Sequence, residues 1–203
     1  MKFYIADTHF DHANIIHFDN RPFTSIEEMN ETIITNWNKV VRKEDEVFIL
    51  GDFCWSKEAR WIELLEQLNG QKTLIVGNHD ITPQKSRRYF ADVKDYKVIT
   101  DNDRKIVLSH YPIPCYRNHF YGWYHLYGHV HTSFEFNMME HDRYLMEELY
   151  TKSCEMYNVG AMLPYMDFTP RTLDEIIEGY KAWKNYRNIS DDLSNISENS
   201  LAN

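Results

Sequence analysis

Residues 47–52 read Val-Phe-Ile-Leu-Gly-Asp, and residues 73–80 read Thr-Leu-Ile-Val-Gly-Asn-His-Asp. In both stretches an apolar run of the length of one buried strand stops at a glycine, and an acidic or amide side chain follows it. Side chains that follow parallel strands meet at one edge of the sheet, where open α/β folds bind their ligands. The two stretches therefore predict an α/β fold with polar ligands at its strand ends.

The same pattern recurs along the chain, which extends the prediction to a whole sheet system. Apolar runs that read as strands cover residues 2–6, 46–50, 73–76, 105–108, 123–127 and 156–159. The later runs lie closer together than the earlier ones, so we expect a mixed sheet rather than a purely parallel one.

Helical patterns separate the strands and predict a layered α/β domain with helices on both faces. The expected helices cover residues 25–41, 57–68, 137–155 and 172–186. The second of these should stop at Asn69-Gly70, and the third reads as a helical excursion that would serve as a lid or a dimer contact. We expect one domain over residues 1–187, followed by a polar, mobile tail over residues 188–203.

Composition restricts the class of protein and its partners. A chain of 203 residues with 43% hydrophobic and 26% charged residues is typical of one soluble globular domain. The net charge of -9 opposes binding to long nucleic acid, whose non-specific affinity comes from basic side chains. Three separated cysteines suggest no disulfide framework, and we find no signal peptide or membrane span. We therefore expect a cytoplasmic protein and leave its oligomeric state open.

Potential metal ligands follow the predicted strands. An isolated Asp or Asn at such a position is usually a turn former, and an isolated histidine is usually structural. Here, however, five successive apolar runs end in a residue that can bind a metal, which favours one shared site. The residues are Asp7 and His9, then Asp52, then Asn78, His79 and Asp80, then His110, and finally His129 and His131.

This ordered set, Asp-x-His, Gly-Asp, Gly-Asn-His-Asp, His and Gly-His-x-His, resembles the calcineurin-like metallophosphoesterase superfamily. The opening Asp-Thr-His-Phe-Asp-His-Ala-Asn-Ile-Ile of residues 7–16 is similar to a small bacterial and phage branch of it. The resemblance implies a four-layered α/β/β/α sandwich with mixed sheets and two divalent metal ions, with manganese the first expectation and iron, zinc or nickel the alternatives. It implies one metal held by Asp7, His9 and His131, a second held by Asn78, His110 and His129, and Asp52 between them.

The resemblance also implies phosphate ester hydrolysis by an attacking hydroxide that the metals activate. His79 has no ligand role in the family pattern, so we assign it to catalysis, with Asp80 orienting its ring. His12 and Asn14 are candidates for substrate binding. We expect a phosphodiesterase acting on a small or nucleotide-type substrate, since Lys85, Arg87 and Arg88 read more readily as solvent-facing than as clamps for a monoester.

Other functions stay open at this point. A phosphomonoesterase or a nuclease would share the same motifs, and a scaffold of this fold could bind metal without turnover. The aromatic residues of 121–127 could stack a base, although alternate residues of a strand more often pack in a core.

Overall fold

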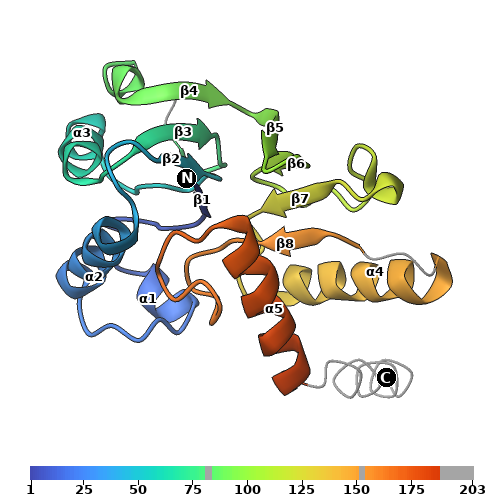
Figure 1. Ribbon diagram of the computed structural model, residues 1–203. Coiled ribbons are helices and arrows are strands. Elements are labelled where there is room, and N and C mark those ends of the chain that lie inside the picture. The colour runs from blue at the N-terminus through green and yellow to red at the C-terminus, as the bar shows by residue number, and fades with distance from the viewer. Residues whose placement is uncertain (81–83, 151–153, 188–203) are drawn as a thin grey trace.

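The computed structural model describes residues 1–80, 84–150 and 154–187, and it contains two four-stranded sheets (Figure 1). The first sheet has the order β1-β2-β3-β4 and is parallel throughout, with strands Lys2–Ile5, Glu46–Ile49, Gln71–Ile75 and Phe90–Lys94. The second has the order β5-β6-β7-β8, with strands Tyr96–Asp101, Arg104–Ser109, Tyr124–Tyr127 and Met156–Asn158. It is mixed, because β5 pairs antiparallel to β6 while the other pairs are parallel.

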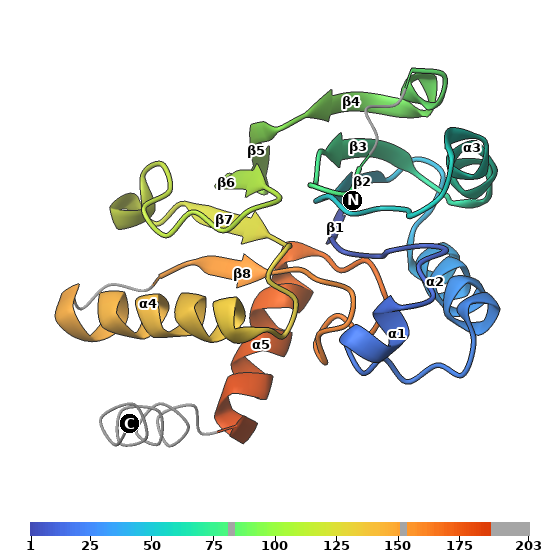
Figure 2. The same ribbon diagram turned by 180° about the vertical axis from the view of Figure 1, so that it is seen from behind.

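Helices lie outside both sheets and complete a four-layered sandwich, seen from two sides in Figures 1 and 2. On the side of the first sheet lie α1 (Ile15–Phe18), α2 (Ile26–Val40) and α3 (Glu58–Gln67). On the side of the second sheet lie α4 (Phe134–Tyr150) and α5 (Leu173–Arg187). Two short 3₁₀ turns, Ser86–Tyr89 and His119–Tyr121, connect other elements. The predicted α/β/β/α sandwich is confirmed.

The alternation of side chains in β1 explains how the layers hold together. Phe3 and Ile5 pack in the cluster that contains α2 and α3, whereas Tyr4 and Ala6 pack in the cluster that contains the second sheet. Successive side chains of a strand point to opposite faces, so an uninterrupted apolar run serves both faces of a buried strand. The Tyr4 hydroxyl also donates to Asp101 Oδ2 (2.9 Å), which joins the two sheets.

The sequence prediction omitted β4 and β5, and these strands join the two sheets. Asp95 alone separates the end of β4 at Lys94 from the start of β5 at Tyr96. Residues 90–101 mix apolar and charged side chains without strict alternation and most are partly exposed, so they lack both the apolar run and the regular period that mark a strand. Their position at the outer edges of the two sheets allows this polar character.

The other elements lie close to their predicted ranges. The helix expected over 137–155 begins earlier, at Phe134, because the Ser133 hydroxyl accepts the backbone N–H of Glu135 (3.2 Å) at its start. The described part of that helix ends at Tyr150. The expected tail, residues 188–203, lies outside the described residues. None of the helices that the structure describes is long and apolar enough to cross a membrane.

Candidate metal centre

Five loops that follow β1, β2, β3, β6 and β7 bring the predicted ligands to one edge of the sandwich. Backbone hydrogen bonds tie the first two loops together, with Asp7 N–H donating to Gly51 O and His9 N–H donating to Asp52 O (both 3.0 Å). Glycines allow this close approach: a Cβ on Gly51 would lie 2.3 Å from His110 Nδ1, and one on Gly77 would lie 2.3 Å from Asp52 Oδ1. The glycines of the two opening stretches are therefore needed for packing at the site.

One group of ligand atoms comes from Asp7, His9, Asp52 and His131, and these atoms all lie within 4.8 Å of one another. His9 Nε2 lies 3.2 Å from His131 Nε2 and 3.6 Å from Asp52 Oδ2. His131 Nε2 lies 3.8 Å from Asp7 Oδ1. Carboxylate and imidazole together suit manganese, iron or zinc.

A second group adjoins the first. His110 Nδ1 donates to the carbonyl of Leu50 (2.8 Å), so in a neutral imidazole Nε2 keeps its lone pair. That Nε2 lies 3.0 Å from Asn78 Oδ1 and 3.6 Å from Asp52 Oδ2. The His129 ring lies beside this pair, with its centroid 5.1 Å from that of His110. Asp52 Oδ2 is thus 3.6 Å from a histidine nitrogen of each group.

These contacts fit a bound cation. His131 Nδ1 donates to Asp19 Oδ1 (2.7 Å), so its Nε2 also keeps a lone pair in the neutral ring. Two pairs of acceptor atoms then face each other: His110 Nε2 and Asn78 Oδ1 at 3.0 Å, and His131 Nε2 and Asp7 Oδ1 at 3.8 Å. Such an arrangement is repulsive by itself, whereas a cation placed among the atoms makes each contact favourable. The donor set passes this test for divalent metal binding.

The burial of the carboxylates and histidines in the centre is further support for a bound cation. Asp7 and Asp52 are almost completely buried. Burial raises the pKa of Asp7 and lowers the pKa of His9 well below its ordinary value. Burial opposes the charge on His131 as well, but Asp7 and Asp19 outweigh it and raise its pKa. Burial therefore disfavours an isolated charge on Asp7 or on His9, whereas the two carboxylates beside His131 favour positive charge at that position.

Two residues that the sequence reasoning missed support this group. The Arg21 guanidinium is buried and donates to Asp19 Oδ2 (2.8 and 2.9 Å), to the carbonyl of Asp7 (2.9 Å) and to that of Thr8 (3.1 Å). Asp19 in turn holds His131. Orienting partners of this kind fix the ring and tautomer of a ligating histidine. Asp19 and Arg21 lie in a loop without periodic pattern, which left no signal in the sequence.

The backbone at the predicted ligands is unusual. Asp7, His9, Asp52, His129 and His131 all have positive φ, at 53°, 48°, 52°, 69° and 47°. Residues with a side chain rarely adopt the left-handed region, and each such residue costs on the order of 1–3 kcal/mol unless its surroundings compensate. Positive φ clusters at functional sites in proteins.

His79 and Asp80 take different positions at the mouth of the centre. The backbone N–H of His79 donates to Asp52 Oδ1 (2.9 Å), and its exposed ring lies 5.9 Å from the ring of His9. The Asp80 carboxylate accepts the backbone N–H groups of Gly77 (2.8 Å), Phe53 (2.9 Å) and Asp52 (3.0 Å). We expected Asp80 to orient the His79 ring; instead it joins two loops, because backbone donors reach both of its oxygens.

The two predicted substrate-binding residues, His12 and Asn14, lie at different places relative to the metal centre. The His12 ring stacks on Trp55, with centroids 4.2 Å apart and planes at 10°, and lies 5.3 Å from the His9 ring. Asn14 is exposed at the start of α1, and its side chain makes no capping hydrogen bond. His12 is therefore close to the centre, whereas Asn14 makes no described contact with it. The sequence reasoning did not single out Trp55.

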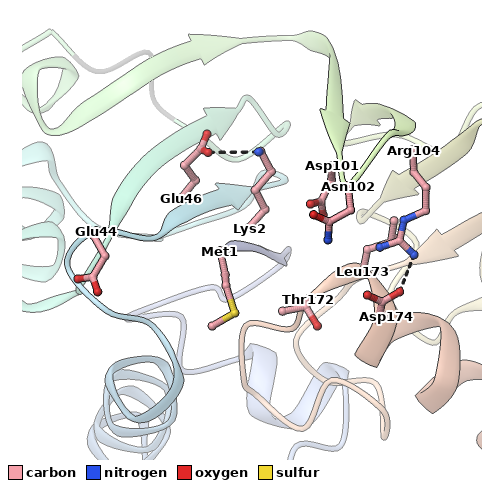
Figure 3. A pocket seen from close by; sticks show the side chains of 10 residues that line it. All are labelled: Met1, Lys2, Glu44, Glu46, Asp101, Asn102, Arg104, Thr172, Leu173 and Asp174. Carbon is pink, nitrogen blue, oxygen red and sulfur yellow. Dashed lines mark hydrogen bonds and ion pairs between the residues drawn. The ribbon is translucent and has the colours of Figure 1, made fainter.

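A second gathering of charges lies at the opposite end of the strands. A cavity of about 360 Å³ lies near the start of β1 and β2 and the turn between β5 and β6, and Figure 3 shows the side chains that line it. Four of its charged side chains form two ion pairs, Lys2 with Glu46 (3.3 Å) and Arg104 with Asp174 (2.5 Å). None of the predicted ligands lines it.

A four-layered sandwich with Asp, His and Asn side chains converging beyond its strand ends defines the class of metal-dependent hydrolases. The chain belongs to the calcineurin-like phosphoesterase family, whose sequence pattern matches residues 3–153. The family assignment makes the protein a metal-dependent phosphoester hydrolase.

Three known proteins are similar to the chain. The uncharacterized protein MJ1445 of Methanocaldococcus jannaschii is 38% identical over 191 residues, which cover 92% of this chain and 95% of that protein. The gene 66 protein of Mycobacterium phage L5 is 34% identical over 80 residues, 38% of each chain. The crystal structure of AQ665 from Aquifex aeolicus, a protein of unknown function, aligns with a TM-score of 0.59 and 26% identity, covering 88% of this chain and 98% of that one.

Proposed function

We propose that the protein hydrolyses small phosphodiesters with two divalent metal ions, manganese first, and that Asp52 is shared between the two metal sites. The observation that carries the proposal is the position of Asp52 Oδ2, 3.6 Å from His9 Nε2 and 3.6 Å from His110 Nε2. One group would comprise Asp7, His9 and His131, and the other Asn78, His110 and His129. Two bound metals would supply an activated water and neutralise phosphate charge.

His79 is our candidate for the acid that protonates the leaving oxygen. Its backbone is fixed by Asp52, while its ring is exposed beside the His9 ring. An imidazolium there would donate a proton to the leaving oxygen as the ester bond breaks. Asp80, which ties the loops of Asp52 and Gly77 together, would position both His79 and Asp52.

The preference for diesters rests on the basic side chains near the centre. Arg21 is already bonded to Asp19 and to two backbone carbonyls, so it is not available to a phosphate. Arg87 is exposed and pairs with Asp92 (3.7 Å), and Arg88 lies over the Tyr89 ring. A monoester dianion benefits from an added cation beyond the metals, whereas a diester carries a single charge.

The experiment begins with metal-depleted protein, to which manganese, iron, zinc or nickel is returned. We expect two metal ions per chain, and a higher kcat/KM for a bis-aryl diester than for the matching aryl monoester. Full activity after verified metal removal would contradict the metal mechanism. One ion per chain at saturation would contradict the sharing of Asp52, and a preference for the monoester would contradict the diesterase assignment.

The proposal includes a small phosphoester or nucleotide substrate and a cytoplasmic location. Cys54, Cys115 and Cys154 are all free thiols, as suits a reducing compartment.

A further inference from the structure

Trp55 is an exposed tryptophan held at the mouth of the metal centre. Its backbone N–H donates to the carbonyl of Phe10 (2.8 Å), and the adjoining Cys54 forms a β-bridge with Phe10. The residue therefore has a fixed place beside the loop that carries His9. Even so, 48% of Trp55 is exposed, whereas Trp37 and Trp61 are fully buried in the core.

Two imidazole rings surround the Trp55 ring. His12 stacks on it at 4.2 Å with nearly parallel planes, and the His79 ring lies 4.5 Å away at 55°. The stack with His12 restricts the indole, so its exposed part presents a rigid aromatic surface. An aromatic surface that is already fixed loses little conformational freedom when a ligand binds.

The place of this surface relative to His79 suggests its use. His79 is the residue that we propose to protonate the leaving oxygen, so the leaving group must pass beside it. A flat ring within that group would then lie within reach of the indole. Aromatic side chains bind bases and aryl rings by stacking, without regard to sequence.

We propose that Trp55, supported by His12, binds an aromatic ring in the leaving group of the substrate, either a nucleobase or an aryl ring. The inference rests on the proposed phosphodiesterase function and adds the chemical class of the leaving group. In this proposal Trp55 contacts the leaving group and determines which substrates bind, and it does not bind the metal ions.

Tyr111 provides a matched control beside the other group of predicted ligands. It is 49% exposed, nearly the same as Trp55, but its ring lies 4.4 Å from His129 and 5.2 Å from His110. Its described ring contacts are with these two histidines, whereas those of Trp55 are with His12 and His79. Replacing it tests whether any exposed aromatic ring near the centre has the same effect.

The kinetic test uses two methyl phosphodiesters with leaving groups of matched acidity, 4-nitrophenol and a polyfluorinated aliphatic alcohol. Trp55→Ala should raise KM for the aryl ester about 5- to 150-fold, the range that stacking of one ring provides. KM for the aliphatic ester should stay near the wild-type value, and Trp55→Phe should restore KM for the aryl ester. Tyr111→Ala should affect both esters equally. Equal effects of Trp55→Ala on both esters would overturn the inference while leaving the proposed function intact.

A binding test needs no turnover and separates the two proposals. Adenosine and 4-nitrobenzyl alcohol, two models of the released group, are titrated into metal-free protein while tryptophan fluorescence is recorded. Quenching that disappears in Trp55→Phe supports the inference, and the effective probe tells a nucleobase from an aryl ring. With quenching but no hydrolysis of any ester, the aromatic site stands and the proposed function fails. Absence of quenching by both probes overturns the inference.

Discussion

The two ends of the sandwich both gather charged and polar side chains, yet they differ in how those side chains face each other. At the start of the strands, each cation meets an anion, as in Lys2 with Glu46 and Arg104 with Asp174. Beyond the opposite ends, acceptors face acceptors in the neutral rings: His110 Nε2 faces Asn78 Oδ1 at 3.0 Å, and His131 Nε2 faces Asp7 Oδ1 at 3.8 Å.

The difference teaches that a hollow does not by itself mark a functional site. In the cavity of Figure 3, the cationic side chains Lys2 and Arg104 each pair with a carboxylate of the cavity wall. In the candidate metal centre, by contrast, the buried His110 Nε2 faces the amide oxygen of Asn78 and the carboxylate of Asp52, and five of the predicted ligands have a left-handed backbone. Groups that the protein does not itself satisfy indicate an external ligand.

The largest effect should come from Asp52→Ala, which removes the atom shared by both groups. We expect bound metal to fall at both positions and kcat/KM to drop by more than about 100-fold, which is the upper range for outer partners of a metal site. Metal analysis and kinetics on the same preparation measure this. Glu46→Ala, at the other end of β2, is the control, and a similar loss there would break the contrast between the two ends.

The next effect separates proton transfer from metal binding. His79→Ala should lower kcat by on the order of 10²–10⁴-fold, because it removes the proposed acid, while metal content stays near the wild-type value. A more acidic leaving group should reduce the loss, since it needs less protonation. The comparison requires a series of aryl diesters, and a loss independent of leaving-group acidity would count against the acid role.

A smaller effect should follow from Asp19→Asn, which weakens the partner of His131 and leaves Arg21 without its carboxylate. We expect metal affinity or activity to fall about 10- to 100-fold. Calorimetric titration of metal-free protein with Mn²⁺ gives the affinity directly. Asp174→Asn, a change of the same chemistry at the far end, should leave that affinity unaltered.

The smallest effect is expected for the ion pairs of the far cavity. Arg104→Ala should lower the free energy of unfolding by less than about 1 kcal/mol, since Asp174 is largely exposed and solvent screens the pair. Activity should be unchanged. Urea unfolding measures the free energy, and the diester assay measures the activity. A marked loss of activity would give this cavity a functional role.

The sequence predicted the parts of the molecule that regular periodicity controls. Buried strands such as β2 need continuous apolar runs, and the residue after each run is placed by the strand, so Asp52 and His110 could be expected at a common edge. The edge strands β4 and β5 carry mixed side chains, because half of each lies near solvent. Asp19, Arg21 and Trp55 are placed by loops and long-range contacts, which no local spacing encodes.

One residue, Asp95, separates the two sheets along the chain, and this affects the order of events during synthesis. When the ribosome has completed β4, the first sheet is present with Asp7, His9, Asp52 and Asn78, but the remaining predicted ligands are not yet made. The emerging chain therefore exposes an incomplete and weakly binding set of donors. If these residues hold metal as we propose, the full set of ligands forms only after β6 and β7 have emerged and docked, so the centre would close late, after both sheets exist.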